Sequence, residues 1–301
     1  MSKYKNVIYG DTDSCYLTLA PYAKLHDIEL DADLAVDIAD KLQARLQEDL
    51  PDQMGNLFLS DPENFSILEP GREVVGRKML SKDAKKRYAL HVVNDEGKSV
   101  DKIKIIGMET KRSDTPKFIQ DFLYECVVAV VQNDAEYGDL KKIVDAFRDE
   151  YRKRDPWFRG LPGRVKNLTK ATNALTAFKK RSTQIGAKKP FVHYKTKSAY
   201  NTNLLMEIHD EQRWDKLRDG DKIELLYLKS NPEGIDAVAI RTGETYIPDW
   251  FKELPFDDIK MEEKLIDDRL SNVVGSILDW DFKPPITAIA DIGTYMDDFY
   301  D

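Results

Sequence analysis

Two aspartates stand two positions apart near the start of the chain, Asp11 and Asp13, in the string YGDTDS at residues 9–14. Apolar β-type runs flank this turn-forming string at residues 7–9 and 15–19, so the sequence predicts a β-hairpin with both carboxylates at its tip. Carboxylates that rigid strands hold in this way can bind a divalent cation. The alternative is an ordinary exposed turn, in which the same residue types are common.

A second string that could carry chemistry is KKRY at residues 85–88. The two-residue period of a strand would place Lys86 and Tyr88 on one face, where an ammonium and a phenol could both meet the groove of a nucleic acid. Lys85 and Arg87 would then face the other way. The alternative is a charged edge strand, in which lysines discourage aggregation.

A helix is predicted between these two strings from hydrophobic periodicity. Asp31 or Asp33 would be its N-cap, and Pro51 would end it. Its apolar positions recur every fourth residue, at Leu34, Ile38, Leu42 and Leu46. The spacing predicts an amphipathic helix.

Further along, residues 88–92 and 103–106 are predicted to pair as a second hairpin around a turn at 94–97. Thr115 and Pro116 favour the start of a helix, and another helix begins near Asp139. The apolar stripe of the first of these helices consists of Phe118, Ile119, Phe122, Leu123, Cys126, Val127, Val130 and Val131. The change from strands to helices predicts a domain boundary near residue 110.

The C-terminal half has weaker signals. The string GLPG at 160–163 favours a break, residues 222–228 and 237–241 favour strands, and residues 262–278 favour a helix. The whole pattern predicts an α+β fold.

The charge distribution is uneven, although the net charge is −8. Acids dominate residues 27–69, which contain only Lys41 and Arg45 as bases. The acids are Asp27, Glu29, Asp31, Asp33, Asp37, Asp40, Glu48, Asp49, Asp52, Asp61, Glu63 and Glu69. Bases dominate residues 151–200, where Asp155 is the acid. They are Arg152, Lys153, Arg154, Arg159, Arg164, Lys166, Lys170, Lys179, Lys180, Arg181, Lys188, Lys189, Lys195 and Lys197. Such segregation favours one face for a polyanion, and a solvated basic loop is the alternative.

Composition narrows the class of protein further. A chain of 301 residues with 42% hydrophobic content is too apolar to be disordered. No run of eighteen apolar residues occurs, so no membrane span is expected. Cys15 and Cys126 lack a C-x-x-C partner and are predicted to be reduced core thiols in an intracellular protein.

Several strings in order resemble the C-terminal part of family B DNA polymerases, especially those of T-even-type tailed phages. YGDTDS is similar to the third palm motif, and KKRYAL at 85–90 is similar to the basic-tyrosine motif. Residues 65–75 and 104–116 resemble the palm segments around that motif, and KPFVHY at 189–194 resembles a thumb segment. The resemblance therefore spans nearly all of the chain.

This resemblance implies a role for each carboxylate. Asp13 would be the direct metal ligand, Asp11 would support it, and Glu73 is a weaker candidate for which a solvated strand residue is the alternative. The implied cofactor is Mg²⁺, which suits an all-oxygen site that touches phosphates. Two such ions would activate the primer 3′-hydroxyl and neutralise the leaving pyrophosphate of a deoxynucleoside triphosphate.

The resemblance also implies contacts with primer-template DNA and with a sliding clamp. The residues that would bind DNA are Lys85, Lys86, Arg87, Tyr88, Lys188, Lys189, Lys195 and Lys197. A C-terminal peptide would dock on the clamp through Tyr295, Met296, Phe299 and Tyr300. The alternative for this peptide is an acidic, frayed terminus.

The implied architecture is the end of a palm at residues 1–110, a mostly helical thumb with a small β element at 111–290, and a flexible tail at 291–301. The exonuclease domain, the first palm motif and the fingers of such polymerases have no counterpart in these residues. Together with the start Met1-Ser2-Lys3, this favours a naturally split gene over a truncated chain, with an N-terminal polymerase chain as partner in the cytoplasm of a bacterial host.

Two expectations follow from the split. An incomplete palm should expose strand edges and apolar surface that another chain covers, and polymerisation should need that chain. The alternatives are a noncatalytic subunit that binds DNA and tethers the clamp, and an unrelated α+β nucleic-acid-binding protein.

Overall fold

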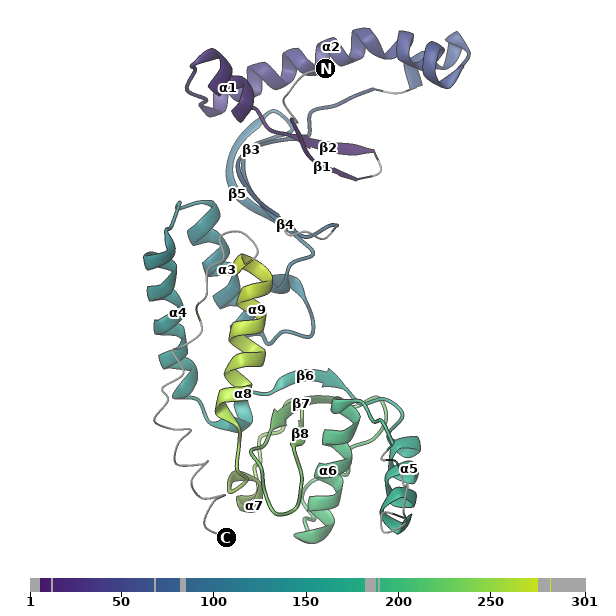
Figure 1. The fold of residues 1–301 in the computed structure, drawn as a ribbon, viewed down its shortest axis with the longest axis vertical. Coiled ribbons are helices and arrows are strands. Elements are labelled where there is room, and N and C mark those ends of the chain that lie inside the picture. The colour runs from purple at the N-terminus through teal and green to yellow at the C-terminus, as the bar shows by residue number, and fades with distance from the viewer. Residues whose placement is uncertain are drawn as a thin grey trace. The chain divides into compact units, whose positions relative to one another are not determined.

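The computed structural model describes residues 6–275 except 12, 68, 82–84, 182–187 and 189, and it also describes residue 282. Contacts divide the chain into two compact units, drawn in Figure 1. Unit 1 contains the residues up to Met108 together with Val127–Asp134, and unit 2 contains Glu109–Cys126 and the residues from Ala135 onward. Both units combine helices with antiparallel strands, which is consistent with the predicted α+β class.

Unit 1 begins with the predicted hairpin, which the structure confirms. Strand β1 (Val7–Asp11) pairs antiparallel with β2 (Ser14–Leu17), and Asp11 faces Ser14 at the last pair. These two strands form a sheet of their own among the described residues. A two-stranded hairpin is marginally stable alone, so its attachment to the rest of unit 1 matters for the site.

A three-stranded sheet forms the centre of unit 1, in the order β3 (Val74–Ser81), β4 (Tyr88–Asp95) and β5 (Lys98–Ile106). The predicted second hairpin is confirmed by the pairing of β4 with β5. Glu96 and Gly97 join them, both at positive φ, as a tight hairpin turn requires. The central strand β4 is buried along most of its length.

The helices of unit 1 are α1 (Ala20–His26), α2 (Ala32–Phe58) and the short η1 (Pro62–Ile67). Asp31, not Asp33, is the N-cap of α2, because its Oδ1 accepts the Leu34 N–H at 2.8 Å. The prediction that Pro51 ends this helix is wrong, since Pro51 lies inside it. Pro51 removes one backbone hydrogen bond from the helix, and in the next turn a Cβ added at Gly55 would lie 3.1 Å from the Phe65 ring of η1.

Two helices match the predicted ones, α3 (Lys117–Val131), whose residues from Val127 belong to unit 1, and α4 (Tyr137–Arg152) of unit 2. Helix α3 buries its predicted positions except the half-buried Phe118, and α4 buries Leu140, Val144 and Tyr151. Short turns η2 (Glu109–Lys111) and η3 (Pro156–Phe158) flank them. On the apolar face of α4 the structure also buries Arg148, which the periodicity did not predict.

A second three-stranded sheet in unit 2 has the order β6 (Leu161–Arg164), β7 (Lys222–Tyr227) and β8 (Ala237–Arg241). The break predicted at residues 160–163 is wrong in part, because most of this string forms the edge strand β6. Proline is tolerated at an edge, and an added Cβ at Gly160 would overlap the Cβ of Glu224.

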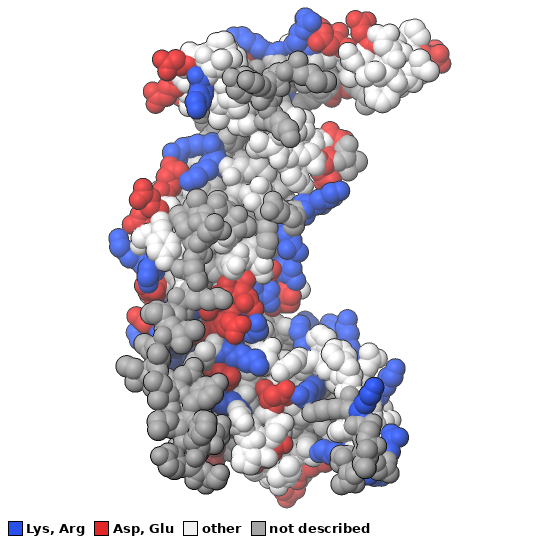
Figure 2. Space-filling model, viewed as in Figure 1, with Lys and Arg blue, Asp and Glu red and all other residues white. Residues whose placement is uncertain are grey.

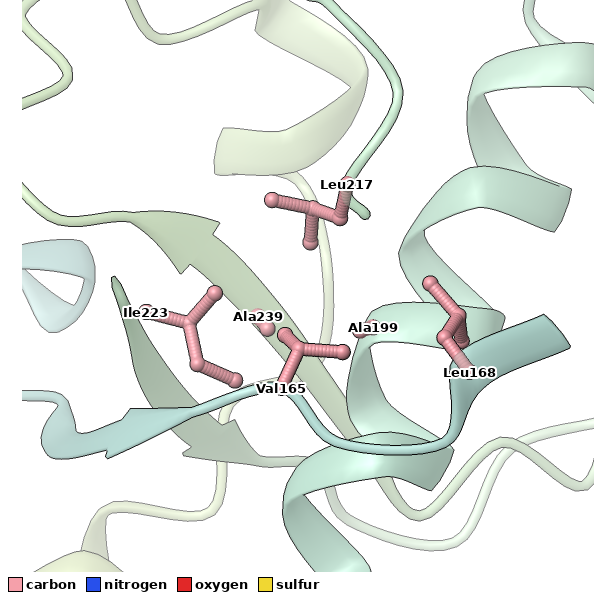
Figure 3. Packing of buried hydrophobic residues seen from close by; sticks show 6 residues of the cluster. All are labelled: Val165, Leu168, Ala199, Leu217, Ile223 and Ala239. Carbon is pink, nitrogen blue, oxygen red and sulfur yellow. The ribbon is translucent and has the colours of Figure 1, made fainter. Parts of the chain in front are cut away.

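Helices α5 (Leu168–Arg181) and α6 (Tyr194–Ile208) complete this part of unit 2. Asn201 and Thr202 of α6 donate to β8 carbonyl groups at 2.8 and 2.9 Å. Figure 3 shows a core in which Ile223 and Ala239 of the strands, Leu168 and Ala199 of the two helices, and Val165 and Leu217 of connecting segments come together. This cluster consists of Val165, Leu168, Ala199, Leu217, Ile223 and Ala239.

The last described helix is continuous over Asp258–Gly275, after the short α7 (Asp249–Lys252). It contains α8 (Asp258–Glu262), η4 (Glu263–Asp267), α9 (Asp268–Leu270) and η5 (Ser271–Gly275), and both η4 and η5 are π turns. The predicted helix at 262–278 therefore begins four residues earlier than expected, and residues 276–278 lie outside the described part.

The two cysteines differ in environment. Cys126 is buried, as predicted, and burial raises the pKa of its thiol. The prediction that Cys15 is a core thiol is wrong, because Cys15 is exposed on β2, where side chains alternate between the two faces of the hairpin. None of the described helices has the length and hydropathy needed to cross a membrane.

Candidate functional site

The tip of the β1–β2 hairpin brings both predicted aspartates close to Lys86. Asp11 ends β1 and Asp13 lies exposed in the turn. The Lys86 ammonium lies 3.1 Å from Asp11 Oδ2. This hydrogen bond with Asp11 raises the pKa of Lys86, and the nearby Asp13 carboxylate adds to the shift. Residues from two separate strings thus form one charged cluster.

Three tyrosines fix this cluster to the central sheet of unit 1. The rings of Tyr9, Tyr16 and Tyr88 lie 5.4 to 6.0 Å apart, and the Tyr16 and Tyr88 hydroxyl groups are 3.2 Å apart. Burial and the Tyr88 hydroxyl raise the pKa of Tyr16, so this phenol stays protonated. The hairpin is therefore attached through aromatic contacts with β4, since within the described part of unit 1 it shares no strand pairing with that sheet.

The geometry of the KKRY string differs from the prediction. Lys86 does not share a strand face with Tyr88, because Lys86 lies in a turn at φ +59° and β4 begins only at Tyr88. Its backbone N–H donates to Tyr9 Oη at 3.1 Å. Lys85 is exposed and Arg87 is half-buried. Tyr88 is only 7% exposed, so its ring packs in unit 1 instead of facing solvent.

Glu73 lies exposed just before β3, and its backbone carbonyl accepts the Glu96 N–H at 2.7 Å. No group of three or more His, Cys, Asp or Glu side chains that could hold a metal ion occurs among the described residues. Glu73 therefore does not complete a ligand set with Asp11 and Asp13. The oxygen donors at the hairpin tip suit Mg²⁺ by type, but they are only part of a set.

Part of the basic segment of unit 2 is used to stabilise the fold. The Arg159 guanidinium is buried and lies 2.8 Å from Asp258, and Arg152 lies 2.6 Å from Glu262. Lys197, a predicted DNA contact, lies 2.5 Å from the Asp236 carboxylate and is mostly buried. The segregation of charge seen in the sequence therefore overstates the basic surface of this unit.

Other predicted DNA contacts remain at the surface. Lys188 is exposed and Lys195 is half-buried, with its side chain lying over Gly163 of β6. Lys189 lies outside the described residues, as do the predicted clamp contacts Tyr295, Met296, Phe299 and Tyr300.

A basic surface lies on and near α5, within the segment 151–200 that the charge distribution favours for a polyanion, although its bases were not among the DNA contacts implied by the resemblance. Figure 2 shows Lys and Arg side chains gathered on this side of unit 2. The exposed bases there are Arg164, Lys166, Lys170, Lys179, Lys180 and Arg181. The signal for a DNA contact here is the run of three consecutive bases in the last turn of α5, with Lys170 in its first turn.

Comparisons with known proteins give partial matches. No protein-family model matches the chain. The chain is similar to the DNA-directed DNA polymerase of Escherichia phage RB69, with 33% identity over 141 residues, 42% of this chain and 15% of that protein. It is also similar to the DNA-directed DNA polymerase of Enterobacteria phage T4, with 40% identity over 74 residues, 24% of this chain and 8% of that protein.

These matches support a relationship with the DNA polymerases of phages and a function related to DNA polymerisation. The matched residues span less than a fifth of the length of either polymerase.

Proposed function

We propose that this chain is the C-terminal part of a family B DNA-directed DNA polymerase that works in phage DNA replication. The observation that carries the proposal is the hairpin tip, where Asp11 and Asp13 lie beside Lys86 in a chain that is partly similar to phage DNA polymerases. In this proposal the end of the palm contains the hairpin, the thumb follows it, and the tail at residues 291–301 binds a sliding clamp.

The proposal assigns different roles to the two aspartates. Asp11 is already neutralised in part by the Lys86 ammonium, which supports Asp13 as the direct metal ligand and Asp11 as its neighbour. Bound Mg²⁺ would supply charge neutralisation during nucleotidyl transfer from a deoxynucleoside triphosphate. Lys86 orients Asp11 and keeps the excess negative charge of the tip low until cations bind.

Two carboxylates from one turn make only part of a two-metal site among the described residues, and the proposal takes the further ligand from a second polypeptide. The second chain would supply a further aspartate, the fingers that bind the nucleotide, and the exonuclease. The heterodimer would be active in the bacterial cytoplasm.

The thumb part of the proposal rests on the basic surface of unit 2. Lys188, Lys189 and Lys195 together with the exposed bases of α5 would contact phosphates of the primer-template duplex, which positions DNA without reading its sequence. Lys197 would take part only after its ion pair with Asp236 opens.

Primer extension with Mg²⁺ tests the proposal. The chain is assayed alone, with the N-terminal polymerase polypeptide encoded in the same genome, and with that polypeptide after Asp13→Ala substitution. We expect synthesis only in the unsubstituted mixture and at least a hundredfold loss with Asp13→Ala. Asp139→Ala, which removes an exposed carboxylate from α4, is the matched control and should leave the rate unchanged.

The same assay tests the second candidate, a noncatalytic subunit that binds DNA and tethers the clamp. The incomplete ligand set among the described residues favours that candidate. Equal synthesis with and without Asp13→Ala would select it, and synthesis by the isolated chain would refute the need for a partner.

A further inference from the structure

Phe282 follows the long helix that ends at Gly275, and it is buried against α4 of unit 2. Its side chain is only 8% exposed, although Phe282 itself belongs to no helix or strand. Its ring stacks on the ring of Tyr137, the first residue of α4, with centroids 5.1 Å apart and 19° between the planes. Contacts with α4 therefore hold this residue in place, because no secondary structure of its own does so.

The backbone of Phe282 is bound as well. Its carbonyl oxygen accepts a hydrogen bond from Arg148 Nη2 of α4 at 3.1 Å, and Arg148 is only 3% exposed. The same guanidinium pairs with Glu262 and with Asp267 of the last described helix. Hydrogen bonds from a charged donor are stronger than those between neutral groups. The arginine that joins α4 to that helix thus also binds the segment that follows it.

Both contacts come from one face of α4. Tyr137 and Arg148 are eleven residues apart, which at 100° per residue is within about 20° of three full turns. Their Cα atoms are separated by about 16 Å along the helix, and side chains of a helix are inclined toward its N-terminus, so Arg148 is inclined toward Tyr137. This face of α4 can therefore bind the ring and the carbonyl group of one residue together.

We infer that this face of α4 is the docking site for the chain's own C-terminal segment, with Phe282 as the anchor. Gly275 and Phe282 are seven residues apart, so the connection spans at most about 25 Å. A connection this short keeps the local concentration of Phe282 at α4 high, which favours docking within one chain over docking between two copies. The anchor then fixes the position from which residues 283–301 continue.

The anchor would also limit the reach of the tail at residues 291–301, and this consequence rests on the proposed function, in which that tail binds a sliding clamp. Tyr295 follows Phe282 by thirteen residues, so the docked segment keeps it within about 45 Å of Phe282. Release of Phe282 would move the fixed point back to Gly275 and lengthen the tether by seven residues. Docking therefore reduces the volume that the tail can search.

Chymotrypsin tests the docking, because it cleaves after accessible aromatic residues. The bond after Phe282 should resist cleavage while the ring is buried, since local release has to precede cleavage. The full chain is digested, mass spectrometry gives the rate at each site, and an added chromogenic peptide normalises the protease activity. Tyr137→Ala should speed cleavage after Phe282 at least tenfold.

Two variants and one internal site serve as controls. Tyr124→Ala removes another exposed tyrosine of unit 2, from α3, and should change the rate less than twofold. Tyr137→Phe keeps the stacked ring and should also leave the rate unchanged. Cleavage after the fully buried Phe251 reports unfolding of unit 2 as a whole, and Tyr137→Ala should not accelerate it.

Three outcomes would overturn the inference. The first is rapid cleavage after Phe282 in the unsubstituted chain, or an equal rate in Tyr137→Ala. The second is an equal acceleration after Phe282 and Phe251, which would mean that Tyr137 supports the whole unit instead of the docked segment. The third is protection that falls on dilution, which would place Phe282 of a second copy on α4.

The digestion contains neither DNA nor clamp, so it separates this inference from the proposed function. Loss of the docking would leave the primer-extension result with Asp13→Ala standing. Loss of the clamp assignment would leave the protection of Phe282 standing.

Discussion

At the scale of residues, Lys86 and Gly107 determine the geometry of the candidate site. Both have left-handed backbone conformations, at φ +59° and +61°, and an added Cβ at Gly107 would overlap the Lys86 carbonyl oxygen. A left-handed lysine costs about 1–3 kcal/mol. The bond from its N–H to Tyr9 and the ion pair with Asp11 offset that cost. The turn is therefore held in place by contacts with the hairpin tip.

Gly107→Ala should destabilise unit 1 and displace Lys86 from Asp11. We expect the free energy of unfolding to fall by about 2 kcal/mol or more, from the positive φ and from the overlap with backbone. Urea denaturation measures it. Gly97→Ala is the matched control, because Gly97 also has a positive φ but has open space around it, and it should cost about 1 kcal/mol. Equal losses for both would show that the contact with Lys86 is unimportant.

Glu224 gives a pH-dependent prediction at the same scale. It lies on the central strand β7, and burial raises the pKa of its carboxyl group. The folded protein then binds a proton more tightly than the unfolded chain, so the stability from this group falls as pH rises from the ordinary glutamate range through the raised pKa. Above that window, the charged carboxylate destabilises the fold.

Glu224→Gln should therefore raise the melting temperature at pH 7, and the gain should vanish near pH 4, where the carboxyl group is protonated in both states. Thermal melts followed by circular dichroism measure both values. The same substitution at the exposed Glu233 should leave the melting temperature unchanged at either pH. A gain for Glu224→Gln that persisted at pH 4 would have to come from a cause other than ionisation.

At the scale of elements, the π turn η4 explains how two acids reach one arginine. Glu262 and Asp267 are five residues apart, and both pair with the buried Arg148 of α4. In an α-helix, neighbours on one face are three or four residues apart, whereas a π turn closes on the fifth residue. The wider turn over Glu263–Asp267 thus brings both carboxylates toward α4.

Arg148→Ala should lower the free energy of unfolding by about 3–5 kcal/mol, because it removes the buried cation shared by Asp267 and Glu262, of which Glu262 keeps its second partner Arg152. Urea denaturation of the whole chain measures the loss. Lys141→Ala, which removes an exposed pair with Asp145 on the same helix, should change the stability by less than about 0.5 kcal/mol. A loss for Arg148→Ala as small as that would mean that the network contributes little.

At the scale of the whole molecule, acidic and basic side chains are concentrated on different helices. Acids dominate α2 of unit 1, and exposed bases gather on and near α5 of unit 2, so the net charge of −8 hides a basic surface. The C-terminal end of α5 is basic, because its last turn contains Lys179, Lys180 and Arg181. These charges also complement the negative end of the helix dipole. A polyanion would be drawn to the α5 surface and repelled by α2.

Replacing Lys179, Lys180 and Arg181 by Ala should weaken duplex DNA binding and flatten its salt dependence. Each lost phosphate contact reduces the slope of log K against log salt by about 0.9, so three contacts give a change of up to about 3. Fluorescence anisotropy with the full chain measures the slopes.

The control replaces Lys117, Lys141 and Lys142, exposed bases that are each paired with an acid on the same helix. It removes the same charge and should leave the slope nearly unchanged. If both triple variants flatten the slope equally, net charge rather than the α5 surface governs binding.

Sequence alone determined the elements and the candidate chemistry of this protein. Turn residues between β-type runs predicted the hairpin that carries Asp11 and Asp13, and the 3.6-residue period predicted α3 and α4. These features are encoded locally, because strand and helix periods are read over a few neighbouring residues. A local motif does not by itself show what a residue does, so the roles of the site residues that were named from the motifs remain predictions.

Tertiary structure decided which residues meet. The pairs of Lys86 with Asp11, Lys197 with Asp236 and Arg148 with Glu262 each join positions far apart in the chain. Local periodicity contains no information about such distant partners, and it also fails where packing overrides propensity, as at Pro51 inside α2. The burial of Tyr88 and the exposure of the α2 leucines follow likewise from which surfaces the packed units cover, and that depends on the arrangement of elements in space.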